Sequence, residues 1–167
     1  MLRLIAINSL MIILLNGCIG QSKEKMFITK YEFENFSQFE GFDIAFRGTD
    51  KQGNLVVFGY APILKNDTSK LIHYVSTLDK NDYQVIETKL SLSEDYVDLD
   101  TLLFQQLAQK FMKYEISRLS VDEKGNVFVY LEDFEKLTMV QFINESELLK
   151  YPHQKWINIK NNWYKPK

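Results

Sequence analysis

The segment that decides the fold is Phe42–Tyr60, with the sequence FDIAFRGTDKQGNLVVFGY. Its first part, Phe42–Arg47, alternates apolar side chains with polar or small ones, which is the pattern of a half-buried β-strand. A cluster of turn-forming residues follows at Asp50–Asn54, and a second apolar run begins at Leu55. Two such runs around a turn that contains Asp, Gly and Asn predict an antiparallel hairpin.

The same pattern recurs later in the chain, where Ile116–Val121 leads into DEKGN (122–126) and then into Val127–Leu131. A third candidate strand follows each hairpin, at Lys70–Val75 and at Lys136–Phe142. Two meanders of similar design point either to an ancient duplication or to shared turn chemistry alone. We favour turn chemistry, because Asp at the start and Gly-Asn at the end of a turn suit many unrelated hairpins.

The clearest helix is predicted between the two meanders, over Asp98–Tyr114. Its apolar residues fall at helical spacing on one side: Leu99, Leu102, Leu103, Leu107, Phe111 and Tyr114. We expect Leu103 and Leu107 near the centre of this stripe, buried against the sheet. A short helical turn is predicted at Glu145–Lys150, ending before Pro152.

These elements predict an α+β fold. We expect a twisted antiparallel sheet of about six to eight strands, built from the two hairpin units, with one main helix over 98–114 packed on it.

The amino terminus has a different composition. Arg3 precedes an apolar run, Leu4–Leu15, which is shorter than the about 20 residues needed to span a bilayer. A charged start, a short apolar middle and a small-residue end are typical of a secretory signal peptide. The final residues, LLNGC (Leu14–Cys18), resemble the lipobox of bacterial lipoproteins. The resemblance implies that residues 1–17 are removed as a signal peptide and that Cys18 becomes the acylated N-terminus, carrying lipid such as palmitate.

Cys18 is the only cysteine of the chain, which excludes a disulfide framework and a thiolate zinc site. The alternatives to lipidation are a signal anchor, or a cleaved leader in which Cys18 is an ordinary thiol. A lone thiol is unusual on an exported chain. We therefore expect a protein held in the bacterial cell envelope by acyl chains, in the outer rather than the inner membrane.

Residues 18–30 are expected to form the lipidated cysteine and a polar tether, and residues 31–167 a single globular domain. The mixed charge at Lys23–Lys25 is either an export address or simply a solvated leash. The chain's net charge of −2 gives no electrostatic footprint for nucleic acid. Twelve Phe, nine Tyr and two Trp are a rich supply for a small core.

Motifs for catalysis or metal binding are absent from the sequence: it has no HExxH, no glycine-rich phosphate loop and no GxSxG. His73 lies in the apolar run LIHYV, where we expect a structural imidazole, and His153 follows Pro152 in an expected surface loop. We predict no catalytic residue, no cofactor and no metal ion.

Acidic residues gather in two places. The first group, Glu94, Asp95, Asp98 and Asp100, could offer oxygens to calcium, but capping of the following helix already accounts for it. The second group, Glu132, Asp133 and Glu135, is expected to be a solvated turn.

The carboxyl end, Lys150–Lys167, contains five lysines, two tryptophans, two tyrosines and no acidic residue. Trp156–Lys160 and Trp163–Tyr164 around Asn161-Asn162 predict a closing hairpin. We expect its aromatic rings to finish the core. The alternative is a contact surface for an anionic headgroup, a glycan or an acidic partner, formed by Trp156, Lys160, Trp163, Lys165 and Lys167. The NNWYKP ending resembles the final segments of small uncharacterised lipoproteins of Bacteroidetes-type bacteria, a likeness that carries no activity with it.

Three classes of function fit these patterns. We expect a non-enzymatic binding domain that acts as a monomer, attached to the membrane through Cys18, with an envelope protein or a glycan as its partner. An immunity or inhibitor lipoprotein that neutralises a toxin or an enzyme is a special case. The third class is a hydrolase of an envelope polymer that uses carboxylates such as Glu94, Asp95 or Glu132.

Overall fold

The computed structural model describes residues 22–64, 67–91 and 101–167. The LLNGC segment with Cys18, and the acidic group Glu94, Asp95, Asp98 and Asp100, lie outside the described residues. The chain divides into two compact units between Glu32 and Phe33.

The described part of the first unit contains one helix, α2 (Lys23–Lys30). The Ser22 hydroxyl caps it by accepting a hydrogen bond from the Lys25 amide at 3.4 Å, and Glu24 lies in its first turn. The rings of Phe27 and Tyr31, one turn apart, lie with their centres 4.8 Å from each other. The segment expected to be a tether is therefore helical from Lys23. The Ser22 cap and the favourable position of Glu24 in the helix dipole stabilise this helix without a long apolar stripe.

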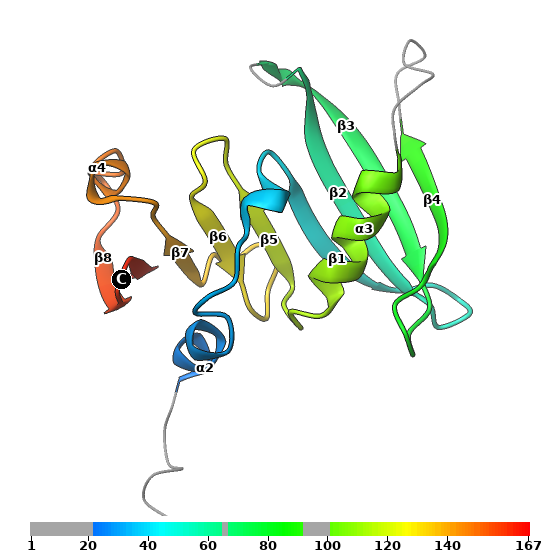
Figure 1. Cartoon of the computed structure of the whole chain (residues 1–167), viewed down its shortest axis with the longest axis horizontal. Helices are drawn as coiled ribbons and strands as arrows, with labels where there is room; N and C mark the ends of the chain where they lie inside the picture. The colour runs from blue at the N-terminus through cyan, green and yellow to red at the C-terminus, as the bar shows by residue number, and fades with distance from the viewer. Residues whose placement is uncertain (1–21, 65–66, 92–100) are drawn as a thin grey trace, which may run out of the picture. The chain divides into compact units, whose positions relative to one another are not determined.

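The described part of the second unit, Phe33–Lys167, is built on one nine-stranded antiparallel sheet of order β4-β3-β2-β1-β5-β6-β7-β9-β8 (Figure 1). Its strands are β1 (Asp43–Thr49), β2 (Leu55–Leu64), β3 (Asp67–Leu78), β4 (Val85–Ser91), β5 (Arg118–Val121), β6 (Val127–Tyr130), β7 (Met139–Gln141), β8 (Trp156–Lys160) and β9 (Trp163–Pro166). The predicted α+β class, with an antiparallel sheet and one main helix, is confirmed. The sheet has one strand more than expected, because β4 was not predicted.

The two predicted hairpins, β1–β2 and β5–β6, lie side by side, because β1 pairs with β5 in the middle of the sheet (Figure 1). Their turns are built alike. In the first, Asp50 Oδ1 accepts from the Asn54 amide at 2.9 Å and Asp50 Oδ2 from the Asn54 side chain at 3.0 Å. In the second, Asp122 and Asn126 make the same two bonds, both at 2.8 Å. The glycine of each turn has a positive φ, 85° and 84°, which glycine adopts at little cost.

The main helix is α3 (Thr101–Met112), which packs on strands β1 to β4 (Figure 1). Its buried side chains are Phe104, Leu107, Ala108 and Phe111. The prediction for Leu107 is confirmed, but that for Leu103 is wrong, since Leu103 is 47% exposed. The residue after Leu103, Phe104, takes the buried position instead, because Gly59 of β2 leaves room for the Phe104 ring against the sheet.

Two short helices complete the second unit in its described part, η1 (Ser37–Phe39) and α4 (Glu145–Leu148). Asn144 caps α4 by accepting a hydrogen bond from the Glu147 amide at 3.1 Å. The helical turn expected at 145–150 and the closing hairpin β8–β9 are both present.

Candidate functional site

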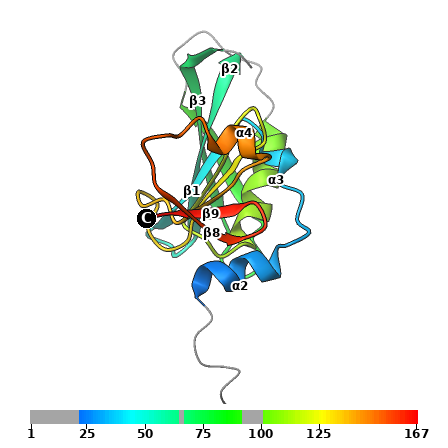
Figure 2. The ribbon, with the colours of Figure 1, turned by 90° about the vertical axis from the view of Figure 1, so that its left-hand side faces the viewer.

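One face of the sheet carries α3, and the opposite face is the candidate site. Phe104 of α3 lies against Gly59, so the neighbouring side chains of β2, Phe58 and Tyr60, lie on the opposite face. In the described part of the second unit, α3 lies to one side of the strands and no helix covers this other face over β1, β2 and β5 (Figure 2). We call this surface the open face.

Strand register places a compact group of side chains on the open face. Asp43 of β1 is paired with Tyr60 of β2, and Ala45 is paired with Phe58 on one side and with Arg118 of β5 on the other. Arg118 is in turn paired with Tyr130 of β6. Because directly paired residues point to the same face, these side chains form two adjacent rows across β2, β1, β5 and β6.

Arg118 is held by contacts on three sides. Its Nε donates to Asp43 Oδ1 at 2.7 Å and its Nη2 pairs with Asp43 Oδ2, while Nη1 donates to the Phe134 carbonyl at 3.2 Å. The guanidinium carbon lies 4.7 Å from the centre of the Tyr130 ring. The hydrogen bond that Arg118 donates to Asp43 raises the pKa of Arg118 against the opposing effect of burial, and burial raises the pKa of Tyr130. This pair fixes β1 against β5 and is largely neutral in charge.

Arg47 lies on the same face, but it contacts aromatic rings and has no carboxylate beside it in the described part of the chain. Its guanidinium carbon is 4.2 Å from the centre of the Phe134 ring and 5.5 Å from that of Phe58. Its side chain is exposed, and among the described residues no carboxylate oxygen lies within 4.0 Å of it. Arg47 is therefore a cation held in place by two rings and without an anionic partner in the described part of the chain.

The choice of arginine at these positions is unusual for this chain. The sequence contains three arginines, Arg3, Arg47 and Arg118, among 20 basic residues. Both arginines of the described residues lie on the open face and each is stacked on an aromatic ring. Arginine binds carboxylates with a planar two-pronged geometry that lysine cannot reproduce. The sequence did not single out these residues, because Asp43 and Arg118 stand 75 positions apart.

His73 extends the open face onto β3. It is paired with Tyr60 across the strands, and its ring meets the Tyr60 ring edge-on with centres 4.7 Å apart. Its side chain is exposed rather than enclosed in the core. The expectation of a structural imidazole in an apolar strand is therefore corrected: β3 alternates between a buried and an open face, and His73 falls on the open one. His153 is exposed, as predicted.

The structure separates the five predicted contact residues of the carboxyl end. Trp163 is only 3% exposed and belongs to the core, whereas Trp156 is half-buried. Lys160 and Lys167 are exposed and Lys165 is half-buried. The three lysines therefore lie at the surface, whereas the Trp163 ring is buried and is not part of that surface.

Trp156 belongs to an aromatic cluster at the same end of the sheet. Its ring lies 5.3 Å from that of Phe142 and 6.2 Å from that of Tyr151, both edge-on, and Tyr164 also contacts Phe142 at 5.7 Å. The indole nitrogen of Trp156 is buried and has no hydrogen-bond partner among the described residues. The cluster stabilises the β7–β9–β8 end by packing, as expected for rings that finish a core.

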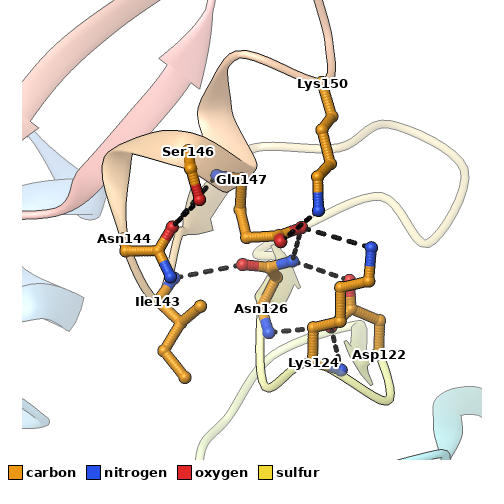
Figure 3. Close-up of polar contacts among 8 residues, drawn as sticks. All are labelled: Asp122, Lys124, Asn126, Ile143, Asn144, Ser146, Glu147 and Lys150. Carbon is orange, nitrogen blue, oxygen red and sulfur yellow. Dashed lines mark hydrogen bonds and ion pairs between the residues drawn. The ribbon is translucent and has the colours of Figure 1, made fainter.

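A polar cluster joins α4 to the β5–β6 turn (Figure 3). Glu147 is 8% exposed and pairs with Lys150 and, at 3.6 Å, with Lys124. Asn126, fully buried, donates to Glu147 at 3.5 Å and accepts from the Ile143 amide at 3.0 Å. The hydrogen bond from Lys150 lowers the pKa of Glu147. Because these groups satisfy one another, the cluster is a structural connection.

The second acidic group follows β6. Asp133 Oδ1 accepts a hydrogen bond from the Glu135 amide at 2.9 Å, and both side chains are exposed, as expected for a solvated turn. Between them, Phe134 reaches back to Arg47 and Arg118 on the open face. Glu132 lies elsewhere. It lines a cavity near the connection between α3 and β5, together with Phe46 of β1 and Met112 of α3.

Comparison with known proteins assigns no family: no family model, no curated protein and no solved structure matches this chain. Within residues 22–64, 67–91 and 101–167, no group of three or more His, Cys, Asp or Glu is arranged to hold a metal ion. In the same ranges, no helix is both long and apolar enough to cross a membrane.

Proposed function

We propose that this chain is a lipid-anchored protein of the bacterial cell envelope, and that its folded domain binds an acidic protein partner through the open face without catalysing a reaction. The LLNGC segment supports the anchor, with acyl chains on Cys18 holding a monomeric domain at the outer membrane.

The observation that carries the binding proposal is the pair of ring-stacked arginines on an uncovered sheet face. Arg47 and Arg118, with Phe58, Tyr60 and Tyr130, form a patch whose composition is that of protein interface centres. Such centres are enriched in aromatic residues and arginine and depleted in lysine.

The charges of the patch define the partner's chemistry. Asp43 already neutralises Arg118, so the charge left to satisfy is that of Arg47. A carboxylate from a partner protein would form an ion pair with Arg47. Its two oxygens match the two parallel N–H groups that the guanidinium offers. A toxin or enzyme neutralised by this protein would be one such partner, captured by the same face.

The test is site-specific photo-crosslinking in intact cells, with benzoylphenylalanine in place of Tyr60. We expect a discrete cross-linked product that weakens strongly with Arg47→Ala, weakens partly with Arg47→Lys, and falls as the salt concentration rises. The matched control is Lys51→Ala, which removes an exposed cation from the adjacent β1–β2 turn. A product that is equally strong in Arg47→Ala contradicts the proposal.

A further inference from the structure

Strand β4 forms one edge of the sheet (Figure 1). In the described part of the chain it pairs with β3 alone, so no strand accompanies it on its other side. An edge of this kind is a template for a further strand unless the chain blocks it. The β3–β4 register is irregular at Ile86, between the pairs that Val85 and Glu87 make, and it is regular from Glu87 to the end of β4. The regular part of the edge can therefore accept another strand.

This edge carries one acidic and one basic side chain, two positions apart. Glu87 Oε2 and Lys89 Nζ form an ion pair within the strand at 2.9 Å, and the two side chains are 54% and 68% exposed. Thr88 stands between them, in the middle of β4 (Val85–Ser91). Opposite charges on the two sides of a central residue are self-complementary, because a half-turn about that residue exchanges their positions.

A second copy of β4, aligned antiparallel over the full strand, places Thr88 opposite the second copy's Thr88. In that register Glu87 stands opposite the second copy's Lys89, and Lys89 opposite the second copy's Glu87. Two attractive pairs form between the strands while the pair within each strand is kept, and opposite charges directly across an antiparallel pair stabilise it. The same register sets Ile86, which is 57% exposed, opposite the second copy's Leu90. Full overlap of the strands and charge complementarity thus select one register.

The other edge strand, β8, lacks this arrangement. Its one charged residue is Lys160, so two copies of β8 aligned about Asn158 form no ion pair. The irregularity in the β8–β9 register lies between Asn158 and Lys160, within the segment that would have to pair. Of the two edges, β4 is therefore the one that matches a second copy of itself.

We propose that two copies of this chain pair through their β4 edges, antiparallel and about a twofold axis at Thr88, into one continuous sheet. An interface made by a single strand is small, so the domain is a monomer when dilute and pairs where copies are concentrated. The inference goes beyond the proposed function, because Arg47 and the rings around it take no part in this pairing.

The pairing also determines how the two open faces lie. Lys89 is paired with Val75 of β3, and Val75 with Phe58 of β2, which lies on the open face. Glu87 and Lys89, two positions apart, therefore point to the side of the open face. A twofold axis that joins side chains of one face runs perpendicular to the sheet, so both copies present Arg47 on the same side. The pair offers two open faces together, which raises the avidity for a partner that is itself multivalent.

The experiment is disulfide trapping in intact cells that express the full chain with Thr88→Cys. Residues directly opposite each other in an antiparallel pair have Cα atoms about 4.5 to 5.5 Å apart, within the range that a disulfide spans. We expect a disulfide-linked dimer after brief oxidation, and none from the chain that keeps Thr88. Asn158→Cys, in the exposed edge strand β8, is the matched control and should give no dimer.

Charge reversal tests the register. In the Thr88→Cys chain, Glu87→Lys or Lys89→Glu turns both pairs between the strands from attractive to repulsive, so each change should reduce the dimer by about fivefold or more. Co-expression of the two reversed chains with different epitope tags should restore a mixed dimer, because each lysine then meets a glutamate of the other chain. Recovery of the mixed dimer also shows that both reversed chains fold.

Four results would each overturn the proposal. They are the absence of a dimer from Thr88→Cys, an equally strong dimer from Asn158→Cys, a dimer that charge reversal leaves unchanged, and a mixture of the reversed chains that does not recover it.

Discussion

The Phe104 ring of α3 lies so close to Gly59 of β2 that a Cβ added to Gly59 would stand 2.0 Å from Phe104 Cε2 and 2.4 Å from Cζ. The ring cannot easily withdraw, because Tyr74 of β3 stacks against it with the ring centres 4.6 Å apart. One missing side chain in the sheet therefore decides how closely the main helix approaches it.

This contact predicts that Gly59→Ala destabilises the fold. Overpacking of a core usually costs about 1 to 3 kcal/mol, and here both the strand and Tyr74 restrict relaxation. Urea denaturation of the chain carrying Cys18→Ser measures the loss. Phe104→Leu should recover part of it in the double variant, because the smaller side chain removes the clash. A cost below about 0.5 kcal/mol, the size of an ordinary surface change, would mean that α3 does not press on β2.

The helix supplies a second prediction, from two leucines four positions apart. Leu107 is 2% exposed and Leu103 is 47% exposed. Leu107→Ala should lower the free energy of unfolding by about 2 to 5 kcal/mol, as buried leucines do, and Leu103→Ala by at most about 0.5 kcal/mol. Thermal denaturation of the two variants compares them directly. Equal losses would show that α3 is rotated from the orientation described.

The polar cluster of α4 predicts an acid-sensitive contribution to stability. The Lys150 hydrogen bond lowers the pKa of Glu147 below its ordinary value of 4.5. A lowered carboxyl pKa stabilises the fold above the ordinary pKa, and that stabilisation is lost as the pH falls through the folded-state pKa. Glu147→Gln should therefore destabilise the protein at pH 7 and cost less at pH values progressively below 4.5.

Urea denaturation at several pH values measures this difference, with Glu145→Gln, an exposed acid of the same helix, as the control. A Glu147→Gln cost that stays constant with pH would disprove the electrostatic origin of the effect.

The expected anchor gives a fourth prediction. Cys18→Ser should abolish incorporation of labelled palmitate and leave uncleaved precursor or protein released from the membrane fraction. Palmitate labelling and membrane fractionation measure the two effects. A Cys18→Ser chain that is still labelled, cleaved and membrane-bound would refute the lipobox interpretation.

Local sequence signals were sufficient for the hairpins. Asp50 and Asp122 each bind the amides of their own turn, so the information for β1–β2 and β5–β6 lies within five consecutive residues. The missed strand β4 lacks such a signal: Val85 and Ile86 are adjacent apolar residues, and a register irregularity lies at that end of the strand, which hides the alternation. An edge strand paired on one side also needs fewer buried residues.

The candidate sites were harder to predict because they depend on contacts between distant segments. The open face joins Asp43 to Arg118, and the cavity joins Phe46 to Glu132, across the pairing of β1 with β5. Periodicity identifies which side of a strand a residue faces but not which strand is its neighbour. The rarity of arginine in the chain is a sequence signal that would have directed attention to Arg47 and Arg118, but the sequence analysis made no use of it.

The central position of β1 has a consequence for how the chain folds. Strands β1 to β4 are consecutive in sequence, so they can pair as soon as they are available, but β1 gains its second neighbour only when β5, beyond α3, arrives. Until then the sheet has an unsatisfied edge at β1, a feature that promotes pairing between chains. Closure of the β1–β5 seam is thus the step at which a nascent chain either becomes a self-contained fold or recruits a neighbour, and the Asp43–Arg118 pair lies on that seam.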